Sequence, residues 1–184
     1  MGSFCLLRLG APHAGHAALV EVLLASGGPC LALIGSGEVV GRPDVPLAWT
    51  ERRDILLAIL RSRGVDASRL VLAPLPELRT AGWDARWCAY VLDAARRALG
   101  VEPRRYVFGD DYDPRVFARM LERAPGLSLV SVPRRYDKSA RELRIAIATQ
   151  APGLLAKYDE ELASYPEESR ARIARACASG VDRP

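Results

Sequence analysis

The chain has 184 residues, of which 49% are hydrophobic and 26% are charged. This length suits one domain, since chains divide into domains above roughly 250–300 residues, and the hydrophobic content excludes a disordered chain. No apolar run approaches the ~20 residues that a membrane-spanning helix needs, and no signal-peptide pattern is present. The net charge of +4 is small and the arginines are scattered, which argues against a nucleic-acid surface. We therefore expect a cytoplasmic protein without membrane or nucleic-acid partners.

The first half of the sequence predicts three strands that alternate with two helices. Its strands are short apolar runs, and its helices have apolar residues at helical spacing. In chain order these elements are strand 4–9, helix 15–25, strand 30–34, helix 50–63 and strand 70–75. The pair Gly27-Gly28 ends the first helix, and Thr50 is expected to cap the second.

The second half continues the alternation and adds a tail. The predicted elements are helix 83–99, strand 105–108, a helix beginning at Pro114, strand 127–132, a helix opened by Ser139 and a helical tail from 151 onward. Pro114 suits the first turn of a helix. Ser139 and Glu142 have the spacing of a capping box.

This alternation predicts an α/β fold, a Rossmann-like five-stranded parallel sheet with helices on both faces and a C-terminal helical tail. We expect one domain over 1–184, with an α/β core over 1–148 and a helical segment over 149–184. In such sheets the ligand binds outside the carboxyl ends of the strands. The loops that follow the strands should therefore hold the functional residues.

Two histidines, His13 and His16, follow the first predicted strand in the run Gly10-Ala11-Pro12-His13-Ala14-Gly15-His16. The helix that starts here should offer free N–H groups and a partial positive charge to an anion. Gly10 and Gly15 would let a phosphate come close. The segment therefore suits a polyphosphate, although a plain helix start with incidental histidines explains it equally well. Because no third ligand is near, we expect no protein metal site.

A second polar segment, 137–144, follows the last predicted strand. Ser139 would cap a helix whose first N–H groups suit a phosphate. Arg141 and Arg144 can add charge-assisted hydrogen bonds. Taken alone, a capped surface helix with solvated charges explains this segment better.

The two segments together carry His-x-Gly-His after the first strand and Ser-x-x-x-Leu-Arg after the fifth. With them, the chain resembles the nucleotidyltransferase superfamily of the H-x-G-H type, in which this pair of motifs grips the phosphates of ATP. Three more segments resemble the second-strand end, a helix start and the ribose-binding fourth-strand end of that superfamily. They are Ile34-Gly35-Ser36, Trp49-Thr50-Glu51-Arg52-Arg53 and Val107-Phe108-Gly109-Asp110-Asp111.

Two further segments favour one branch of this superfamily. The run 83–91 is similar to the Asn/Asp-x-x-Trp-x-x-x-Val segment of archaeal-type nicotinamide mononucleotide (NMN) adenylyltransferases, and 165–169 resembles the Leu-Pro-Glu-Ser of their tail. The resemblance implies that Trp87 stacks on the cationic nicotinamide ring and that Asp84 accepts a hydrogen bond from its carboxamide. A core tryptophan and a free exposed acid are the respective alternatives.

The resemblance implies transfer of the adenylyl group of ATP to NMN, with Mg²⁺ as cofactor, in a homo-oligomer. It assigns catalysis to His13, His16 and Arg144, and acceptor binding to Asp84 and Trp87. It assigns ATP binding to Arg8, Leu9, Gly10, Gly15, Gly109, Asp111, Ser139 and Arg141.

The chain departs from the family in two motifs. The family's Gly-Arg-Phe-x-Pro reads Leu7-Arg8-Leu9-Gly10-Ala11, and its Ser-Gly-Thr reads Ser139-Ala140-Arg141. These changes leave the phosphate contacts possible. They leave open the shape of the loop and, with it, the preferred substrate. Two alternatives therefore stay open, a different phosphorylated acceptor and a non-catalytic nucleotide-binding protein on the same fold.

Overall fold

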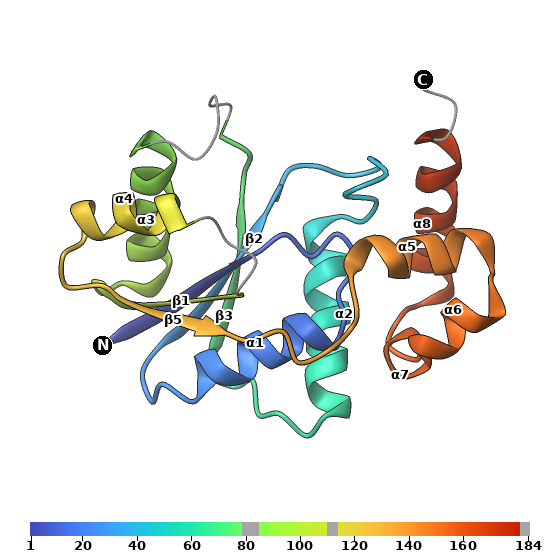
Figure 1. The fold of residues 1–184 in the computed structure, drawn as a ribbon, viewed down its shortest axis with the longest axis horizontal. Coiled ribbons are helices and arrows are strands. Elements are labelled where there is room, and N and C mark those ends of the chain that lie inside the picture. The colour runs from blue at the N-terminus through green and yellow to red at the C-terminus, as the bar shows by residue number, and fades with distance from the viewer. Residues whose placement is uncertain (79–84, 110–113, 181–184) are drawn as a thin grey trace.

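The computed structural model describes residues 1–78, 85–109 and 114–180. Five parallel strands form one sheet in the order β3-β2-β1-β4-β5. The strands are β1 Gly2–Leu7, β2 Cys30–Gly35, β3 Leu70–Leu75, β4 Pro103–Gly109 and β5 Ser128–Val132. The helices are α1 Ala14–Leu24, α2 Trp49–Ser62, α3 Ala85–Leu99, α4 Pro114–Arg123, α5 Ala140–Thr149, α6 Pro152–Lys157, α7 Asp159–Leu162 and α8 Glu167–Gly180. This architecture confirms the Rossmann-like α/β fold expected from the sequence (Figure 1).

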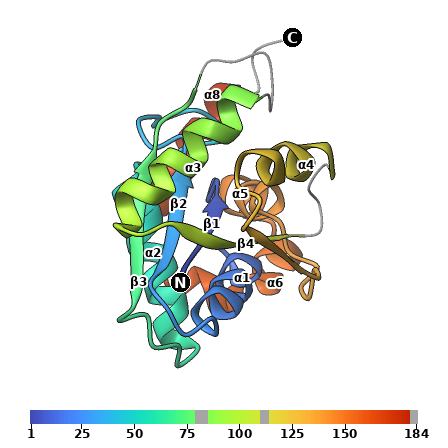
Figure 2. The ribbon, with the colours of Figure 1, turned by 90° about the vertical axis from the view of Figure 1, so that its left-hand side faces the viewer.

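Helices cover both faces of the sheet (Figure 2). One core combines residues of α1, α2, α5 and α8 with Cys5 and Leu7 of β1. The other combines residues of α3 and α4 with Phe4, which stacks on Tyr106 at a ring-centroid distance of 4.7 Å. Successive side chains of β1 thus enter opposite cores, as the continuous apolar run predicts.

β1 lies in the middle of the sheet. β2 and β3, which follow it in the chain, lie on one side of it, and β4 and β5 lie on the other side. The loops that follow β1 and β4 therefore diverge at the carboxyl edge of the sheet. That edge is where open α/β sheets bind their ligands.

The first strand ends, and the second helix begins, at a residue other than the one predicted. β1 ends at Leu7 because Leu9 has a φ of +50°, which is outside the strand region. Thr50 does not cap α2: the N-cap is Ala48, and Thr50 lies inside the helix. The Ala48 N–H donates to Glu51 Oε2 at 3.1 Å, so a carboxylate in the first turn binds the backbone at this helix end.

The cap of α5 is as predicted, but only half of the capping box forms. Ser139 Oγ accepts from the Glu142 N–H at 3.1 Å. The Ser139 N–H donates to the Tyr158 hydroxyl at 2.9 Å and not to Glu142. The Tyr158 hydroxyl in turn donates to Glu142 Oε2 at 2.6 Å, so the C-terminal segment completes the start of α5.

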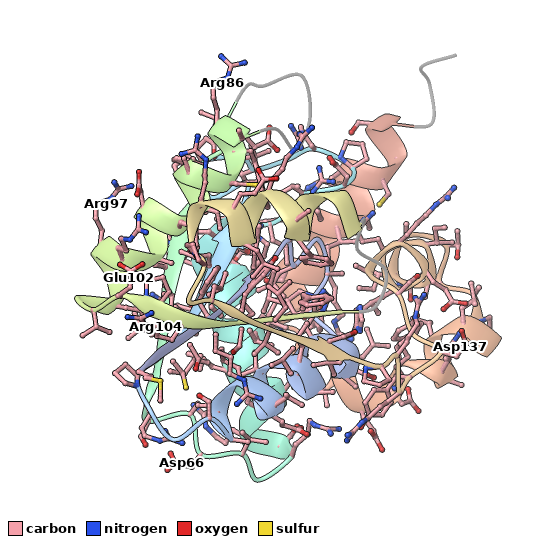
Figure 3. The ribbon with its side chains drawn as sticks, turned by 60° about the vertical axis from the view of Figure 1, so that its left-hand side comes forward. Asp66, Arg86, Arg97, Glu102, Arg104 and Asp137 are labelled. Atoms are coloured by element: carbon pink, nitrogen blue, oxygen red, sulfur yellow. The ribbon has the colours of Figure 1, made fainter. Side chains whose placement is uncertain are left out.

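Charged side chains cover the outside of the molecule, and opposite signs are interspersed. Figure 3 shows Arg97, Glu102 and Arg104 pointing outward at the end of the molecule opposite Asp137. Here Arg96 pairs with Glu102 at 2.7 Å. Within the described part of the chain, no helix is both long enough and apolar enough to cross a membrane.

Candidate functional site

A cavity of ≈ 370 Å³ lies at the carboxyl edge of the sheet, beside the N-termini of α1 and α5. Polar groups line it from the loops after β1 and β5, and apolar side chains line it from β1, α1 and β5. The polar or basic lining residues are Arg8, His13, His16, Arg134, Arg135, Tyr136, Lys138 and Ser139. The remaining lining residues are Leu6, Leu7, Gly15, Ala18, Leu19, Gly109, Val132, Pro133 and Ala140. The cavity therefore joins an apolar wall to a cationic, donor-rich wall.

The side chains of His13 and His16 each accept a hydrogen bond from a backbone N–H group at the start of α1. His13 is the N-cap, and its Nδ1 accepts from the Gly15 N–H at 3.1 Å. His16 Nδ1 accepts from the His13 N–H at 3.2 Å. The two rings lie 4.0 Å apart between centroids. Gly15 is needed for this arrangement, since a Cβ there would lie 2.8 Å from His13 Cε1.

Both imidazoles are neutral at neutral pH. Burial, together with the positive charges of Arg134 and Lys138, lowers the pKa of His13 to about 4. Burial and the neighbouring His13 hold the pKa of His16 well below its usual value. Because each Nδ1 accepts a hydrogen bond, the proton of each ring is on Nε2. The pair thus offers two fixed Nε2–H donors.

The backbone donors at the start of α1 are already used, in contrast to the expectation from the sequence. The N–H groups of His13 and Gly15 bind the two imidazoles. The Ala14 N–H donates to Glu161 Oε1 at 3.2 Å. An anion in the cavity would therefore meet imidazole donors and cations rather than free N–H groups of this helix.

Arg144 lies against the loop that follows β1. A Cβ at Gly10 would lie 2.6 Å from Arg144 Nη1 and 2.5 Å from the Asp44 carbonyl oxygen, so only glycine fits there. Burial lowers the pKa of Arg144, but an arginine stays charged. Arg144 thus brings a half-buried positive charge to the loop that precedes His13.

A buried arginine of the segment 49–53, to which the sequence analysis assigned no role, joins the ends of β1 and β2. The Arg52 guanidinium donates to the carbonyl oxygens of Arg8 at 2.7 Å, Gly35 at 2.9 Å and Ser36 at 2.8 Å. Its side chain is fully buried, and burial lowers its pKa to about 10, so it remains charged. It fixes both strand ends beside Leu9 and Ser36, which have φ of +50° and +54°.

The C-terminal segment braces the site through three side chains to which the sequence analysis assigned no role in the site. Tyr158 binds the Ser139 N–H, and Glu161 binds both the Ala14 N–H and Lys138. The Tyr165 hydroxyl donates to the Pro12 carbonyl oxygen at 2.6 Å. These residues lie near the site only through tertiary packing, far along the chain from α1, and no local pattern indicates such contacts. They connect the loop after β1 with the loop after β5.

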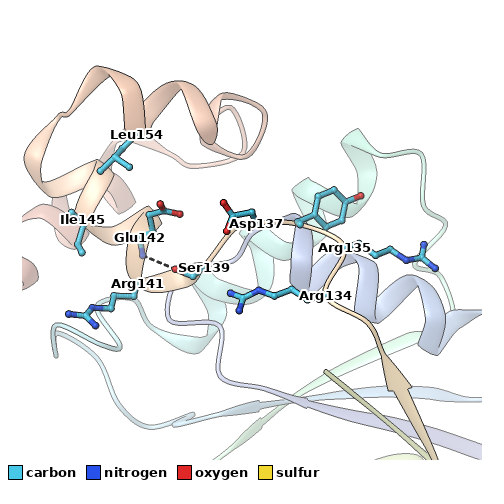
Figure 4. Close-up of a pocket in the computed structure, with 9 residues that line it drawn as sticks. Arg134, Arg135, Asp137, Ser139, Arg141, Glu142, Ile145 and Leu154 are labelled. Atoms are coloured by element: carbon cyan, nitrogen blue, oxygen red, sulfur yellow. Dashed lines mark hydrogen bonds between the residues drawn. The ribbon is translucent and has the colours of Figure 1, made fainter. Parts of the chain in front are cut away.

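The structure brings together six of the predicted site residues around the cavity. Those that line the cavity are Arg8, His13, Gly15, His16, Gly109 and Ser139. Leu9 is fully buried in the core, so only its backbone can face a ligand. Arg141 lines a neighbouring shallow pocket with Arg134 and Arg135 (Figure 4). Asp84 and Asp111 lie outside the described residues.

The predicted acceptor residue Trp87 is not in this cavity. It lies in the first turn of α3, is half-buried, and packs against the core on the other face of the sheet. In the loops that follow β2 and β3, Arg42 pairs with Asp44 at 3.1 Å and with Glu77 at 2.9 Å. Trp87 thus belongs to the side of the sheet covered by α3 and α4, whereas the histidine cavity lies beside α1 and α5.

A pH titration of stability tests the neutral state of His13. Its pKa in the folded protein, about 4, lies below the unfolded value of 6.5, so the unfolded chain binds the proton first. The stability from neutral His13 is present above pH 6.5 and is lost as the pH falls toward 4, by up to about 3 kcal/mol. We expect His13→Asn, which keeps a capping side chain, to show a shallower slope in chemical denaturation over this window. Equal slopes would contradict the depressed pKa.

Comparison with solved structures finds proteins of the same fold. A bifunctional NMN adenylyltransferase/ADP ribose pyrophosphatase from Francisella tularensis, complexed with AMP and a manganese ion, matches with a TM-score of 0.73 and 14% identity over 98% of this chain. This chain spans 54% of that protein's length. Pantothenate synthetase from Thermus thermophilus matches with a TM-score of 0.50 and 19% identity, over 90% of this chain and 77% of its own.

These neighbours share the fold of this chain. The identities are low, so the likeness concerns the fold and leaves substrates open. No protein-family model matches the sequence, and comparison with curated proteins gives no match either.

Proposed function

We propose that the chain is a nucleotidyltransferase of the H-x-G-H type that transfers the adenylyl group of ATP to NMN, giving NAD and pyrophosphate. The observation that carries the proposal is the pair of neutral imidazoles, each with its Nδ1 occupied and its Nε2–H available as a donor, lining the cavity. Fixed donors of this kind stabilise charge that develops on phosphate oxygens. The Francisella neighbour, described as an NMN adenylyltransferase, supports this choice.

The cavity has the two walls that a nucleotide needs. Ala18, Leu19 and Val132 provide an apolar wall for a flat base. His13 and His16 stand on the polar wall, where the phosphates would lie. The volume of ≈ 370 Å³ is in the range of small-molecule sites.

The proposed chemistry is a direct displacement at phosphorus. A phosphate oxygen of the acceptor forms a bond to the α-phosphorus of ATP, and the bond from that phosphorus to the bridging oxygen breaks. The bond's electron pair leaves with pyrophosphate. The protein holds the two reactants in line and donates hydrogen bonds from the imidazoles to the phosphate oxygens, while Arg144 offsets their charge.

The expected Mg²⁺ would be carried mainly by the nucleotide. Among the described residues, no carboxylate lines the cavity, and no three His, Cys, Asp or Glu side chains form a cluster that could hold a metal ion. Mg²⁺ commonly binds substrate phosphates and keeps several waters, and there it offsets phosphate charge. The manganese ion of the Francisella structure is consistent with a divalent cofactor.

Trp87→Ala tests the proposed acceptor site. If the indole stacks on the pyridinium ring, roughly 0.5–2 kcal/mol of attraction is lost. The KM for NMN should then rise between about twofold and thirtyfold, while the KM for ATP should barely move. Trp87→Phe should fall between wild-type and Trp87→Ala, since a smaller ring still stacks.

Trp49→Ala is the matched control for this test. Trp49 is also half-buried and packs on a core, but it lies on α2 in the opposite cluster. It should lower the melting temperature without changing the ratio of the two KM values. If Trp87→Ala behaves in the same way, its role is in the core and the acceptor assignment fails.

A panel of phosphorylated acceptors tests the choice of NMN. Pyrophosphate release with ATP should be fastest with NMN. Faster release with another acceptor would keep the nucleotidyltransferase and replace the acceptor. If ATP binds but no pyrophosphate is released with any acceptor, the result would support a non-catalytic protein instead.

The location and assembly of the protein stay predictions. They are that it is a cytoplasmic homo-oligomer without nucleic-acid or membrane partners.

A further inference from the structure

Lys138 and Glu161 form a buried ion pair at the edge of the cavity. Lys138 Nζ donates to Glu161 Oε1 at 2.8 Å and to Oε2 at 2.9 Å. The Glu161 side chain is 2% exposed and that of Lys138 is 17% exposed. Burying two charges costs several kcal/mol per ion. A pair in this position therefore calls for a reason beyond stability.

The pair is connected to the proposed phosphate site on both sides. Glu161 Oε1 also accepts the Ala14 N–H at the start of α1, where an anionic ligand would otherwise be attracted. Lys138 lines the cavity together with His13 and Ser139. Its charge also acts on the site, since it helps to lower the pKa of His13.

The donor count leaves Lys138 able to bind a second anion. A lysine ammonium has three N–H donors, and Glu161 takes two of them. The carboxylate holds the flexible side chain at the cavity edge and offsets its charge. The other lysine of the chain, Lys157, binds Asp137 and Glu142 and does not line the cavity.

We propose, on the basis of the proposed function, that Lys138 is a further phosphate-binding residue and that Glu161 is its positioning residue, whose negative charge limits the affinity for phosphate. The carboxylate keeps Lys138 in place while it repels the anion that Lys138 binds. The pair thus allows the site to hold a polyphosphate and still release pyrophosphate after each reaction.

Binding of inorganic pyrophosphate, measured by calorimetry, tests this proposal without turnover. Glu161→Gln keeps an oxygen for the Ala14 N–H and removes the opposing charge, so pyrophosphate should bind several-fold more tightly than to wild-type. Lys138→Met alone would leave the buried Glu161 carboxylate without a positive charge beside it and could unfold the protein. The double variant K138M/E161Q removes both charges. It should bind pyrophosphate at least about tenfold more weakly than E161Q does, because a charge-assisted hydrogen bond is lost.

Lys157→Met is the control and should bind pyrophosphate as wild-type does. Melting temperatures of all variants confirm that each is folded. Equal affinity of E161Q and K138M/E161Q would overturn the role of Lys138. Affinity of E161Q no higher than wild-type would overturn the role of Glu161. Because pyrophosphate binding requires no acceptor, this result stands apart from failure of the adenylyl transfer.

Discussion

Replacement of His16 by alanine is expected to lower kcat about 10²–10³-fold, the usual cost of removing one preorganised donor to a developing negative charge. The imidazole is held by the His13 N–H at Nδ1, so its Nε2–H is fixed before the substrate binds. Such a donor acts mainly in the transition state. The loss should therefore appear in kcat rather than in the KM for ATP.

His16→Asn is the matched variant for this prediction. Its side-chain oxygen can still accept the His13 N–H and preserve the start of α1, while the donor toward the cavity is moved. It should remain as stable as wild-type in thermal denaturation and be nearly as slow as His16→Ala. Near-normal turnover of His16→Ala would show that the pair only caps the helix.

Replacement of Arg52 by methionine is expected to cause the largest loss of stability. The three carbonyl oxygens of Arg8, Gly35 and Ser36 would lose their charged donor and stay buried. Losing hydrogen bonds of this kind should cost about 3 kcal/mol or more. For a domain of this size that corresponds to a fall in melting temperature of roughly 6–12 °C.

Arg53→Met is the control for Arg52. Arg53 is the next residue of α2, but its partner Asp54 is 62% exposed, and such surface pairs contribute about 0–1 kcal/mol. The melting temperature of this variant should stay close to that of wild-type. A similar fall in both variants would show that the buried clamp has no special role.

The sheet and its order of elements followed from sequence because local periodicity determines them. The apolar run of β1 and the amphipathic α3 are signals contained in a few neighbouring residues. The predicted end of β1 was wrong because Leu9 adopts a left-handed conformation. The predicted cap of α2 was wrong because the helix begins at Trp49, which places Thr50 inside its first turn.

The residues that line the cavity could be predicted from the sequence only in part. Motifs identified His13, His16 and Ser139, and the topology places them around one cavity. Lys138 and Glu161 meet through tertiary packing, which local patterns do not reveal. The expectation of free N–H groups at the start of α1 was wrong for the same reason, since one of their partners, Glu161, comes from the far end of the chain.

The most direct test of the proposed activity is the reaction itself. Purified protein is incubated with ATP, NMN and Mg²⁺, and NAD and pyrophosphate are measured in the same samples by mass spectrometry and by a coupled assay. Both products should form in equal amounts, should depend on the divalent ion and should be strongly reduced in His16→Ala. No NAD above an enzyme-free sample at millimolar substrate concentrations would contradict the proposed activity.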